Sequence, residues 1–336
     1  MKIIVDNKIP YIRETLERIA DKVIYMPGGE IDNNAVKDAD AIIIRTRTNC
    51  NKELLEGSKV KFIGTATIGF DHIDTQYCHD KNITWRNCPG CNAGAVEQYV
   101  HAVLLLLQKE KGIELKESCI GIVGAGHVGT RISNMAQRLG IKVLLNDPPR
   151  EDKGEEGFVS LDTIAEKCNI ITFHTPLIRE GIYKTEHLAN RSFFGKLKKR
   201  PVIINTSRGE VIDTQAILEA LNTKQISEAI IDVWENEPKI NAELLNKVFI
   251  GTPHIAGYSA NGKLNATIMV LESLCSFFNI NTHINIQLPA DPNAPYSPNE
   301  NIRILQQYNP HYDYDALLEH PEKFENLRGN YNLRRE

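Results

Sequence analysis

The chain has 336 residues, of which 42% are hydrophobic and 24% are charged, and its formal net charge is −4. That length predicts about two domains with a large buried core. The slight acidic surplus argues against a general nucleic-acid binder and against a protein that binds anionic membranes, since both need basic residues. The densest apolar run, residues 103–107, is far shorter than the ~20 residues that a membrane span needs.

The seven cysteines are too few and too scattered for a disulfide framework. Cys88 and Cys91 form a C-x-x-C pair, for which a thioredoxin-like redox site and half of a zinc site are the alternatives. No second C-x-x-C pair completes a zinc site, so we expect no metal and interpret the pair as two reduced thiols in a loop. Asp6 comes too early for a secretory signal, and we therefore expect a cytoplasmic protein.

The first 90 residues alternate between predicted strands and a predicted helix. Strands are expected at residues 2–6, 41–45, 60–65 and 83–87. A helix is expected at residues 13–23, where apolar side chains recur on one face. Residues 41–45 are almost wholly apolar, as parallel strands covered on both faces are. A long helix follows, from Asn92 as a candidate N-cap to the region of Gly112.

The alternation continues through the second half of the chain. Strands are expected at residues 118–123, 142–146, 170–174, 202–205, 229–233 and 248–251. Helices are expected at residues 126–139, 161–167, 186–197 and 214–222. Repeats of this kind predict an α/β fold in which helices cover both faces of a parallel sheet.

The C-terminal part has a different pattern. After a predicted helix at residues 261–278, the Pro- and Asn-rich residues 288–300 indicate a linker or an extended arm. Residues 301–336 are too few for a core of their own, so we expect them to pack on another part of the protein.

The strongest motif is a G-x-G-x-x-G loop directly after the predicted strand at 118–123. Its first glycine permits a tight turn, its second lets the backbone approach a pyrophosphate, and its third lets the following helix pack closely. The start of that helix adds free N–H groups and a partial positive charge. The expected dinucleotide-binding residues are Gly124, Gly126, His127, Val128 and Gly129.

Asp147 ends the next predicted strand, about 20 residues further on, where dinucleotide-binding folds place an acidic residue. A carboxylate there binds ribose hydroxyls and repels a 2′-phosphate, which favours NAD over NADP. Arg150 is the one nearby residue that argues for NADP. The alternative is a glycine turn in another kind of α/β protein.

Three polar segments follow predicted strands in the second half of the chain. They contain Arg208, the acidic residues 232–237 and His254. The carboxyl ends of parallel strands form the ligand-binding edge of such a sheet. An arginine there offers two parallel donors to a carboxylate, and a histidine takes the hydroxyl proton that hydride transfer from an alcohol releases. A structural role is the alternative for His254.

These segments resemble the D-isomer-specific 2-hydroxyacid dehydrogenases over residues 1 to about 280. The resemblance is carried by residues 2–7, 61–67, 89–93, 146–150, 172–177, 232–235 and 254–258. The segments 89–93 and 146–150 together point to one member of that family, whose substrate is phosphorylated.

The resemblance implies a Rossmann-type NAD domain, residues 94–255, inserted into a flavodoxin-like substrate domain. The substrate domain consists of residues 1–93 and 256–285. Residues 286–336 are expected to form a small C-terminal dimerisation segment, shortened relative to the family. The implied reaction is NAD-dependent oxidation of a small phosphorylated 2-hydroxy acid at C2, by a homodimer without nucleic-acid or membrane partners.

The resemblance also implies roles for individual residues. The catalytic residues are expected to be Arg208, Glu237 and His254. Further NAD contacts are expected at Asp147, Thr175, Asp232 and Gly257. Substrate contacts are expected at Thr46, Thr67 and Tyr258.

The substrate phosphate requires cations. Arg45 and Arg47 fall on the same side if the strand at 41–45 continues, so we expect Arg45 to bind the phosphate. The alternative is one solvated arginine and one surface ion pair. The tail arginines, Arg328, Arg334 and Arg335, are candidates for reaching the pocket of a neighbouring subunit.

Two alternative functions remain open on the sequence alone. The first is another dehydrogenase of the same family, such as a phosphoglycerate dehydrogenase. The second is a non-catalytic NAD-sensing scaffold on the same fold, which can retain both the glycine loop and the polar residues.

Overall fold

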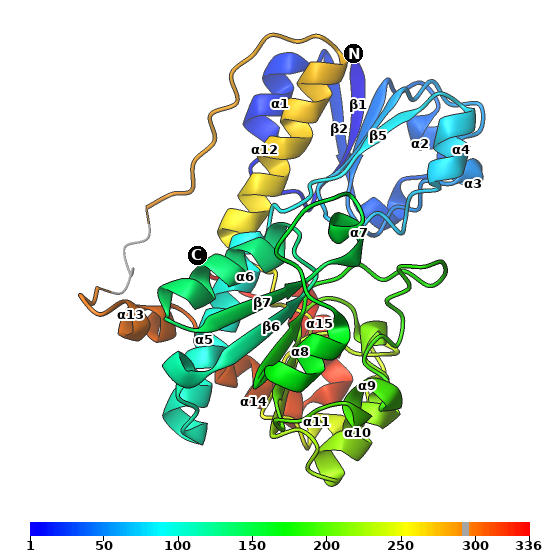
Figure 1. Ribbon diagram of the computed structural model, residues 1–336. Coiled ribbons are helices and arrows are strands. Elements are labelled where there is room, and N and C mark those ends of the chain that lie inside the picture. The colour runs from blue at the N-terminus through cyan, green and yellow to red at the C-terminus, as the bar shows by residue number, and fades with distance from the viewer. Residues whose placement is uncertain (291–295) are drawn as a thin grey trace. The chain divides into compact units, whose positions relative to one another are not determined.

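The computed structural model describes residues 1–290 and 296–336, which form two compact units (Figure 1). The first unit comprises residues 1–92 and 259–290, and the second comprises residues 93–258 and 296–336. Within these ranges no helix has the length and apolar character that a membrane span requires. The middle of the expected arm at 288–300 lies outside the described residues.

The first unit contains a five-stranded parallel sheet in the order β2-β1-β3-β4-β5. Its strands are β1 (Lys2–Asp6), β2 (Lys22–Met26), β3 (Ala41–Ile44), β4 (Phe62–Thr65) and β5 (Thr84–Arg86). Its helices are α1 (Arg13–Ile19), α2 (Asn33–Val36), α3 (Lys52–Leu55), α4 (Thr75–Asp80) and α12 (Ala260–Phe277), with a 3-10 turn, η1, at Gly28–Glu30. This strand order is the flavodoxin-type order, and it reverses direction between β1 and β3.

Alternate residues of the central strands pack on opposite faces of this sheet. Phe62 packs with Val270 of α12 on one face, and Ile63 packs with Leu54 of α3 on the other. Gly64 permits a close helix contact, because a Cβ atom there would lie 2.3 Å from the side chain of Val270.

The second unit contains a six-stranded parallel sheet in the order β11-β10-β9-β8-β6-β7. Its strands are β6 (Cys119–Val123), β7 (Lys142–Asn146), β8 (Ile170–Phe173), β9 (Val202–Asn205), β10 (Glu228–Ile231) and β11 (Ile250–Gly251). The helices up to residue 258 are α5 (Ala93–Lys111), α6 (His127–Arg138), α7 (Pro148–Glu151), α8 (Leu161–Lys167), α9 (Arg191–Gly195), α10 (Thr214–Asn222) and α11 (Ala242–Leu245), with 3-10 turns at Leu115–Glu117 (η2) and Gly209–Val211 (η3). The order reverses between β6 and β8, and a ligand crevice is expected at the carboxyl ends of these two strands.

The C-terminal tail is helical and belongs to the second unit (Figure 1). It forms α13 (Glu300–Gln307), α14 (His311–Glu319), the 3-10 turn η4 (Pro321–Lys323) and α15 (Phe324–Gly329). Leu317 and Phe324 are completely buried in the core on one face of the sheet, and Tyr308 is buried in the core on the other. The expectation that the tail packs on another part of the protein is therefore confirmed, as is an α/β fold with parallel sheets.

The prediction of a helix over residues 13–23 is wrong at its C-terminal end. α1 ends at Ile19, and Ala20 is already extended, with φ −119° and ψ 141°. β2 then pairs along its whole length with β1. Its sequence, Lys-Val-Ile-Tyr-Met, is rich in the β-branched and aromatic residues that favour strands, but Val23 also fitted the helical period.

Two other local expectations are corrected. The helix expected at 186–197 is reduced to α9, because the side chain of Asn190 caps it by accepting a hydrogen bond from the N–H of Phe193. His187 has a φ of 50°, which a continuous helix does not allow. Asn92 does not cap α5, since its side-chain oxygen is buried and has no hydrogen-bond partner among the residues that the structure describes.

Candidate active site

The glycine loop joins β6 to α6 in the geometry that a dinucleotide pyrophosphate requires. Gly124 has a φ of +94°, and a Cβ atom on Gly129 would lie 2.0 Å from the Gly124 oxygen, so both positions need glycine. A Cβ atom on Gly126 would meet no atom within 4 Å, which leaves open space in front of the helix. Gly126 is the N-cap of α6 and makes no side-chain capping bond, and the start of a helix offers its free N–H groups to an anion.

The neighbouring residues of this loop lie in the first turn of α6. His127 is exposed, whereas Val128 is partly buried and packs on the core of the unit. His127 is thus the side chain of the two that can reach a bound ligand, and Val128 offers its backbone N–H.

Asp147 stands at the carboxyl end of β7, beside the glycine loop. Its Oδ2 accepts a hydrogen bond of 2.8 Å from the N–H of Ala125, and its Oδ1 caps α7. The guanidinium of Arg150 is held by Glu155, to which its Nε donates over 3.0 Å. Arg150, the residue that argued for NADP, therefore already pairs with a carboxylate.

Thr175 follows β8 across the reversal point of the sheet. Its Oγ1 is buried and has no hydrogen-bond partner in the described chain, which is the state expected of a hydroxyl that awaits a ligand. Its methyl group would lie 3.0 Å from a Cβ atom on Gly124, so it borders the glycine loop. Together with the open space at Gly126, these observations show that the residues present fit a dinucleotide cofactor.

His174 precedes Thr175 and holds the ends of two strands together. Its ring nitrogens lie 2.8 Å from Oγ1 of Thr172 and 3.2 Å from Oγ1 of Thr206. Burial lowers the pKa of His174 to about 3, so the ring stays neutral at physiological pH. No sequence pattern singles out His174, because its contacts depend on the packing of β8 beside β9.

Arg208, Glu237 and His254 follow β9, β10 and β11, which are neighbours in the sheet. Gly209 permits the first two segments to approach closely, since a Cβ atom there would lie 2.0 Å from the backbone of Trp234. The structure thus brings all three segments to the carboxyl edge of one sheet.

His254 and Glu237 form a direct pair. Nδ1 of His254 lies 2.8 Å from Oε2 of Glu237, and the two side chains are 25% and 17% exposed. Oε1 of Glu237 accepts a hydrogen bond of 2.9 Å from the N–H of Trp234. Burial acts to raise the pKa of Glu237, but the hydrogen bond and charge of His254, with smaller help from Arg328, lower the pKa below its ordinary value. Glu237 is therefore an ionised partner for the ring, and Nε2 is the nitrogen that remains for proton transfer.

The backbone of His254 adopts a left-handed conformation, with φ +58°, that is uncommon outside glycine. Asp232, which is 1% exposed, holds the loop in place. Its Oδ1 accepts hydrogen bonds from the N–H of Ile255 (2.8 Å) and the hydroxyl of Thr252 (2.7 Å), and its Oδ2 accepts one from the N–H of Ala256 (3.0 Å). Burial raises the pKa of Asp232. A contact of Asp232 with NAD remains a prediction.

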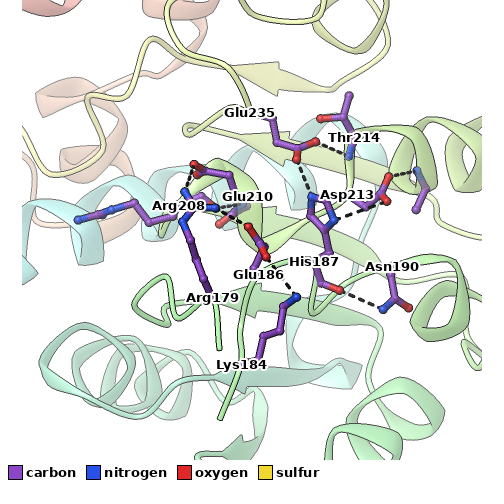
Figure 2. A network of polar contacts seen from close by, with 12 residues as sticks. Arg179, Lys184, Glu186, His187, Asn190, Arg208, Glu210, Asp213, Thr214 and Glu235 are labelled. Atoms are coloured by element: carbon purple, nitrogen blue, oxygen red, sulfur yellow. Dashed lines mark hydrogen bonds and ion pairs between the residues drawn. The ribbon is translucent and has the colours of Figure 1, made fainter. Parts of the chain in front are cut away.

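Arg208 is half-buried and lies beside an ion-pair network (Figure 2). Its Nη1 donates to the oxygen of Ser207 over 2.8 Å. In the network, Arg179 pairs with Glu210, and Nε2 of His187 lies 2.7 Å from Oε1 of Glu235. These pairs connect the segments after β9 and β10 to the loop before α9.

The first unit holds the other expected substrate residues at the ends of two paired strands. Arg45 and Thr46 follow β3, and Thr67 follows β4. Nη1 of Arg45 donates to the oxygen of Lys8 (3.4 Å), and Oγ1 of Thr67 donates to the oxygen of Gly69 (2.8 Å). Both segments lie near the carboxyl edge of this sheet.

The premise for placing Arg45 and Arg47 on one side is wrong. β3 ends at Ile44, and residues 46–48 form a turn, so the alternation of a strand does not apply to them. The run of four buried apolar residues ends there, and Arg45 is the first residue that is not fully buried.

Gly257 and Tyr258 follow the His254 loop, with Gly257 in a turn. The hydroxyl of Tyr258 accepts a hydrogen bond of 3.3 Å from Nε of Arg328. Arg328 and Arg334 both contact residues of their own chain, and contact of the tail arginines with a neighbouring subunit remains a prediction. No local pattern links these tail arginines to residues some 70–80 positions earlier, so sequence analysis did not find the contacts.

The C-x-x-C pair lies in the first unit. Cys88 and Cys91 are both buried and are not in a disulfide, and Sγ of Cys88 lies 3.3 Å from the oxygens of Thr65 and Ala266. Burial raises the pKa of the Cys88 thiol to about 12, so this thiol is unreactive at neutral pH.

Comparison with known proteins adds four findings. Residues 94–256 match the family model of the D-isomer specific 2-hydroxyacid dehydrogenase, NAD binding domain. The chain is 59% identical to the erythronate-4-phosphate dehydrogenase of Bacteroides fragilis, over 100% of its own length and 97% of the relative's. The structure resembles the NAD⁺-bound 3-phosphoglycerate dehydrogenase of Entamoeba histolytica, with a TM-score of 0.69 and 28% identity, over 86% of this chain and 99% of that one. It also resembles the D-lactate dehydrogenase of Aquifex aeolicus complexed with NAD and lactic acid, with a TM-score of 0.67 and 26% identity, over 83% of this chain and 96% of that one.

Proposed function

The chain belongs to the D-isomer-specific 2-hydroxyacid dehydrogenases, and we propose that it oxidises 4-phospho-D-erythronate at C2 to (R)-3-hydroxy-2-oxo-4-phosphooxybutanoate, with NAD, in pyridoxal 5′-phosphate biosynthesis. The observation that carries the chemistry is the His254–Glu237 pair on the same sheet edge as Arg208 and the glycine loop. The full-length similarity to erythronate-4-phosphate dehydrogenases carries the choice of substrate.

The chemistry that bound NAD would supply is a hydride acceptor for the hydrogen on C2 of the substrate. The glycine loop, including His127 and Val128, would hold the pyrophosphate, and Asp147 would bind the ribose hydroxyls. The remaining NAD contacts in this proposal are Thr175, Asp232 and Gly257.

His254 would take the C2 hydroxyl proton at Nε2, so that C2 and its oxygen become a carbonyl group. Glu237 holds the opposite ring nitrogen over 2.8 Å and stabilises the imidazolium that forms. Because Glu237 is ionised, it can take this role without accepting the proton itself.

Arg208 would bind the substrate carboxylate with two parallel donors and polarise the developing carbonyl oxygen. Thr46, Thr67 and Tyr258 would contact the substrate, and Arg45 would contact its phosphate. Arg45 lies where the first sheet reverses direction, at the end of β3 and against the oxygen of Lys8 after β1, which is where doubly wound sheets bind ligands.

We extend the proposal to the organisation of the chain. Residues 94–255 would form the NAD domain, and residues 1–93 and 256–285 would form the substrate domain. The residues from 286 onward would form a C-terminal dimerisation segment. The exposed Tyr312 and Ile302 on the tail helices favour a homodimer. Sedimentation at micromolar concentration tests this, because a monomer would contradict it. None of the seven cysteines is in a disulfide, which favours a cytoplasmic location.

The test of the function is NADH formation with three candidate substrates. We expect turnover of 4-phosphoerythronate and little turnover of 3-phosphoglycerate or unphosphorylated erythronate. Preference for 3-phosphoglycerate would assign the chain to phosphoglycerate dehydrogenases, and NAD binding without any turnover would indicate an NAD-sensing scaffold.

A further inference from the structure

The C-terminal tail ends on the loop that carries His254. Arg334 is 8% exposed, and its guanidinium donates to the backbone oxygens of Ile255 over 3.0 Å and Ala256 over 2.5 Å. These are the two residues that follow the proposed general base directly in the chain.

The same two residues are held from their N–H side by Asp232. Ile255 and Ala256 are thus each held on both sides, through the N–H group by Asp232 and through the carbonyl group by Arg334. His254, the residue before them, has a left-handed backbone conformation that is strained for a residue other than glycine. Holding Ile255 and Ala256 on both sides opposes a change of that backbone to a more common conformation.

The remaining donors of Arg334 anchor it to the second unit. Nε donates to Gln98 of α5 over 2.9 Å, Nη2 donates to the oxygen of Ala95 over 3.1 Å, and Nη1 donates to the hydroxyl of Tyr331 over 3.3 Å. The ring of Tyr308 lies 4.1 Å from the guanidinium carbon. All five N–H donors of this arginine therefore have acceptors, which a buried guanidinium requires and a lysine could not reproduce.

We propose that Arg334 is a positioning residue for the reaction, which fixes the Ile255–Ala256 backbone and thereby aligns His254 with Glu237. The proposal rests on the proposed function for the identity of the reaction. It makes the tail of this chain a part of its own active-site framework.

The experiment compares Arg334→Ala, Arg334→Lys and the control Arg303→Ala in the full-length chain. Arg303 lies on α13 of the same tail and donates to the oxygen of Ser297. For each variant, kcat and KM for 4-phosphoerythronate are measured after NAD binding has been verified by titration. Amide hydrogen exchange over residues 252–258 and thermal unfolding are measured on the same samples.

For Arg334→Ala we expect kcat to fall by up to about 100-fold, as misplacement of a catalytic group by ~1 Å can do, with a smaller change in KM. Exchange should accelerate at Ile255 and Ala256, and added ethylguanidinium should restore part of the rate. Arg334→Lys should retain a folded protein but lose most of kcat, and Arg303→Ala should match the unmutated enzyme.

The proposal is overturned if exchange at residues 252–258 and kcat in Arg334→Ala both match Arg303→Ala. It is also overturned if activity falls only in step with thermal stability and ethylguanidinium restores nothing. If Arg334→Ala does not fold, Arg334→Lys decides by the same readouts. If the unmutated chain oxidises no substrate, the proposed function fails, and the exchange comparison still decides whether Arg334 holds the loop.

Discussion

Nη1 of Arg328 lies 3.5 Å from Oε2 of Glu237, the same oxygen that contacts His254. The carboxylate of Glu237 thus has an arginine on one side and the imidazole on the other. Arg328 comes from the last helix of the tail, α15, so the tail places a charge beside the His254–Glu237 pair and also holds the His254 loop through Arg334.

A double-mutant cycle tests whether Arg328 acts through Glu237. Arg328→Gln should lower kcat/KM in the unmutated background and have little further effect in Glu237→Gln. The interaction energy between contacting charged residues is about 0.5–3 kcal/mol. The fold-change in kcat/KM caused by Arg328→Gln should therefore be severalfold or more larger in the unmutated background than in Glu237→Gln. Fully additive effects of the two changes would show that Arg328 acts elsewhere, for example through its contact with Tyr258.

The pH dependence of oxidation follows from the charge on Glu237. The pKa of Glu237 is held below its ordinary value, so this carboxylate stays ionised through the mildly acidic range, and the acidic fall in kcat/KM reports protonation of His254. Glu237→Gln removes the negative charge that favours the imidazolium, and the acidic limb should therefore move to lower pH.

His254→Ala is the companion variant for this measurement. Its kcat should fall by about 10²–10⁴-fold, the usual contribution of a general base, and the remaining activity should lack the acidic limb. NAD titration controls for the integrity of the cofactor site. A near-normal kcat with an unchanged limb would assign the base to another residue.

We expect the preference for NAD over NADP to depend on Asp147, beside the glycine loop, and on Glu155, which pairs with Arg150. Asp147→Ala should narrow the preference for NAD over NADP, because the charge that repels a 2′-phosphate is lost. The double variant Asp147→Ala with Glu155→Gln should narrow the preference for NAD further. Arg150 then loses its ionised partner and is available to a 2′-phosphate. Ratios of kcat/KM for the two cofactors measure both effects. Equal use of NAD and NADP by the unmutated enzyme would contradict the assignment of Asp147.

The parts of the fold that the sequence predicts well are those set by local patterns. The buried apolar strands and the glycine loop around Gly124 depend on residues close together in the chain, so period and motif find them. The sequence pattern did not predict β2, because its few apolar residues fit the period of a helix as well as that of a strand. Pairing with β1 stabilises the strand.

The residues of the candidate site also differ in whether a local sequence pattern predicts them. Arg208 and His254 could be singled out because each follows a buried strand at the ligand-binding edge. The contacts of Arg328 and Arg334 arise only when the tail packs on the second unit, and no spacing in the sequence encodes them.

Recognition of the substrate phosphate is tested at Arg45. This residue follows the buried strand β3 and lies against the oxygen of Lys8, at the reversal point of the first sheet. Arg45→Ala should raise KM for 4-phosphoerythronate by about tenfold or more, since a charge-assisted hydrogen bond contributes about 1.5–3 kcal/mol. KM for unphosphorylated erythronate should change much less. Arg18→Ala, which removes an exposed arginine of α1 in the same unit, is the matched control. Steady-state kinetics with both substrates tests this prediction. An equal rise in KM for 4-phosphoerythronate and for erythronate would show that Arg45 does not bind the phosphate.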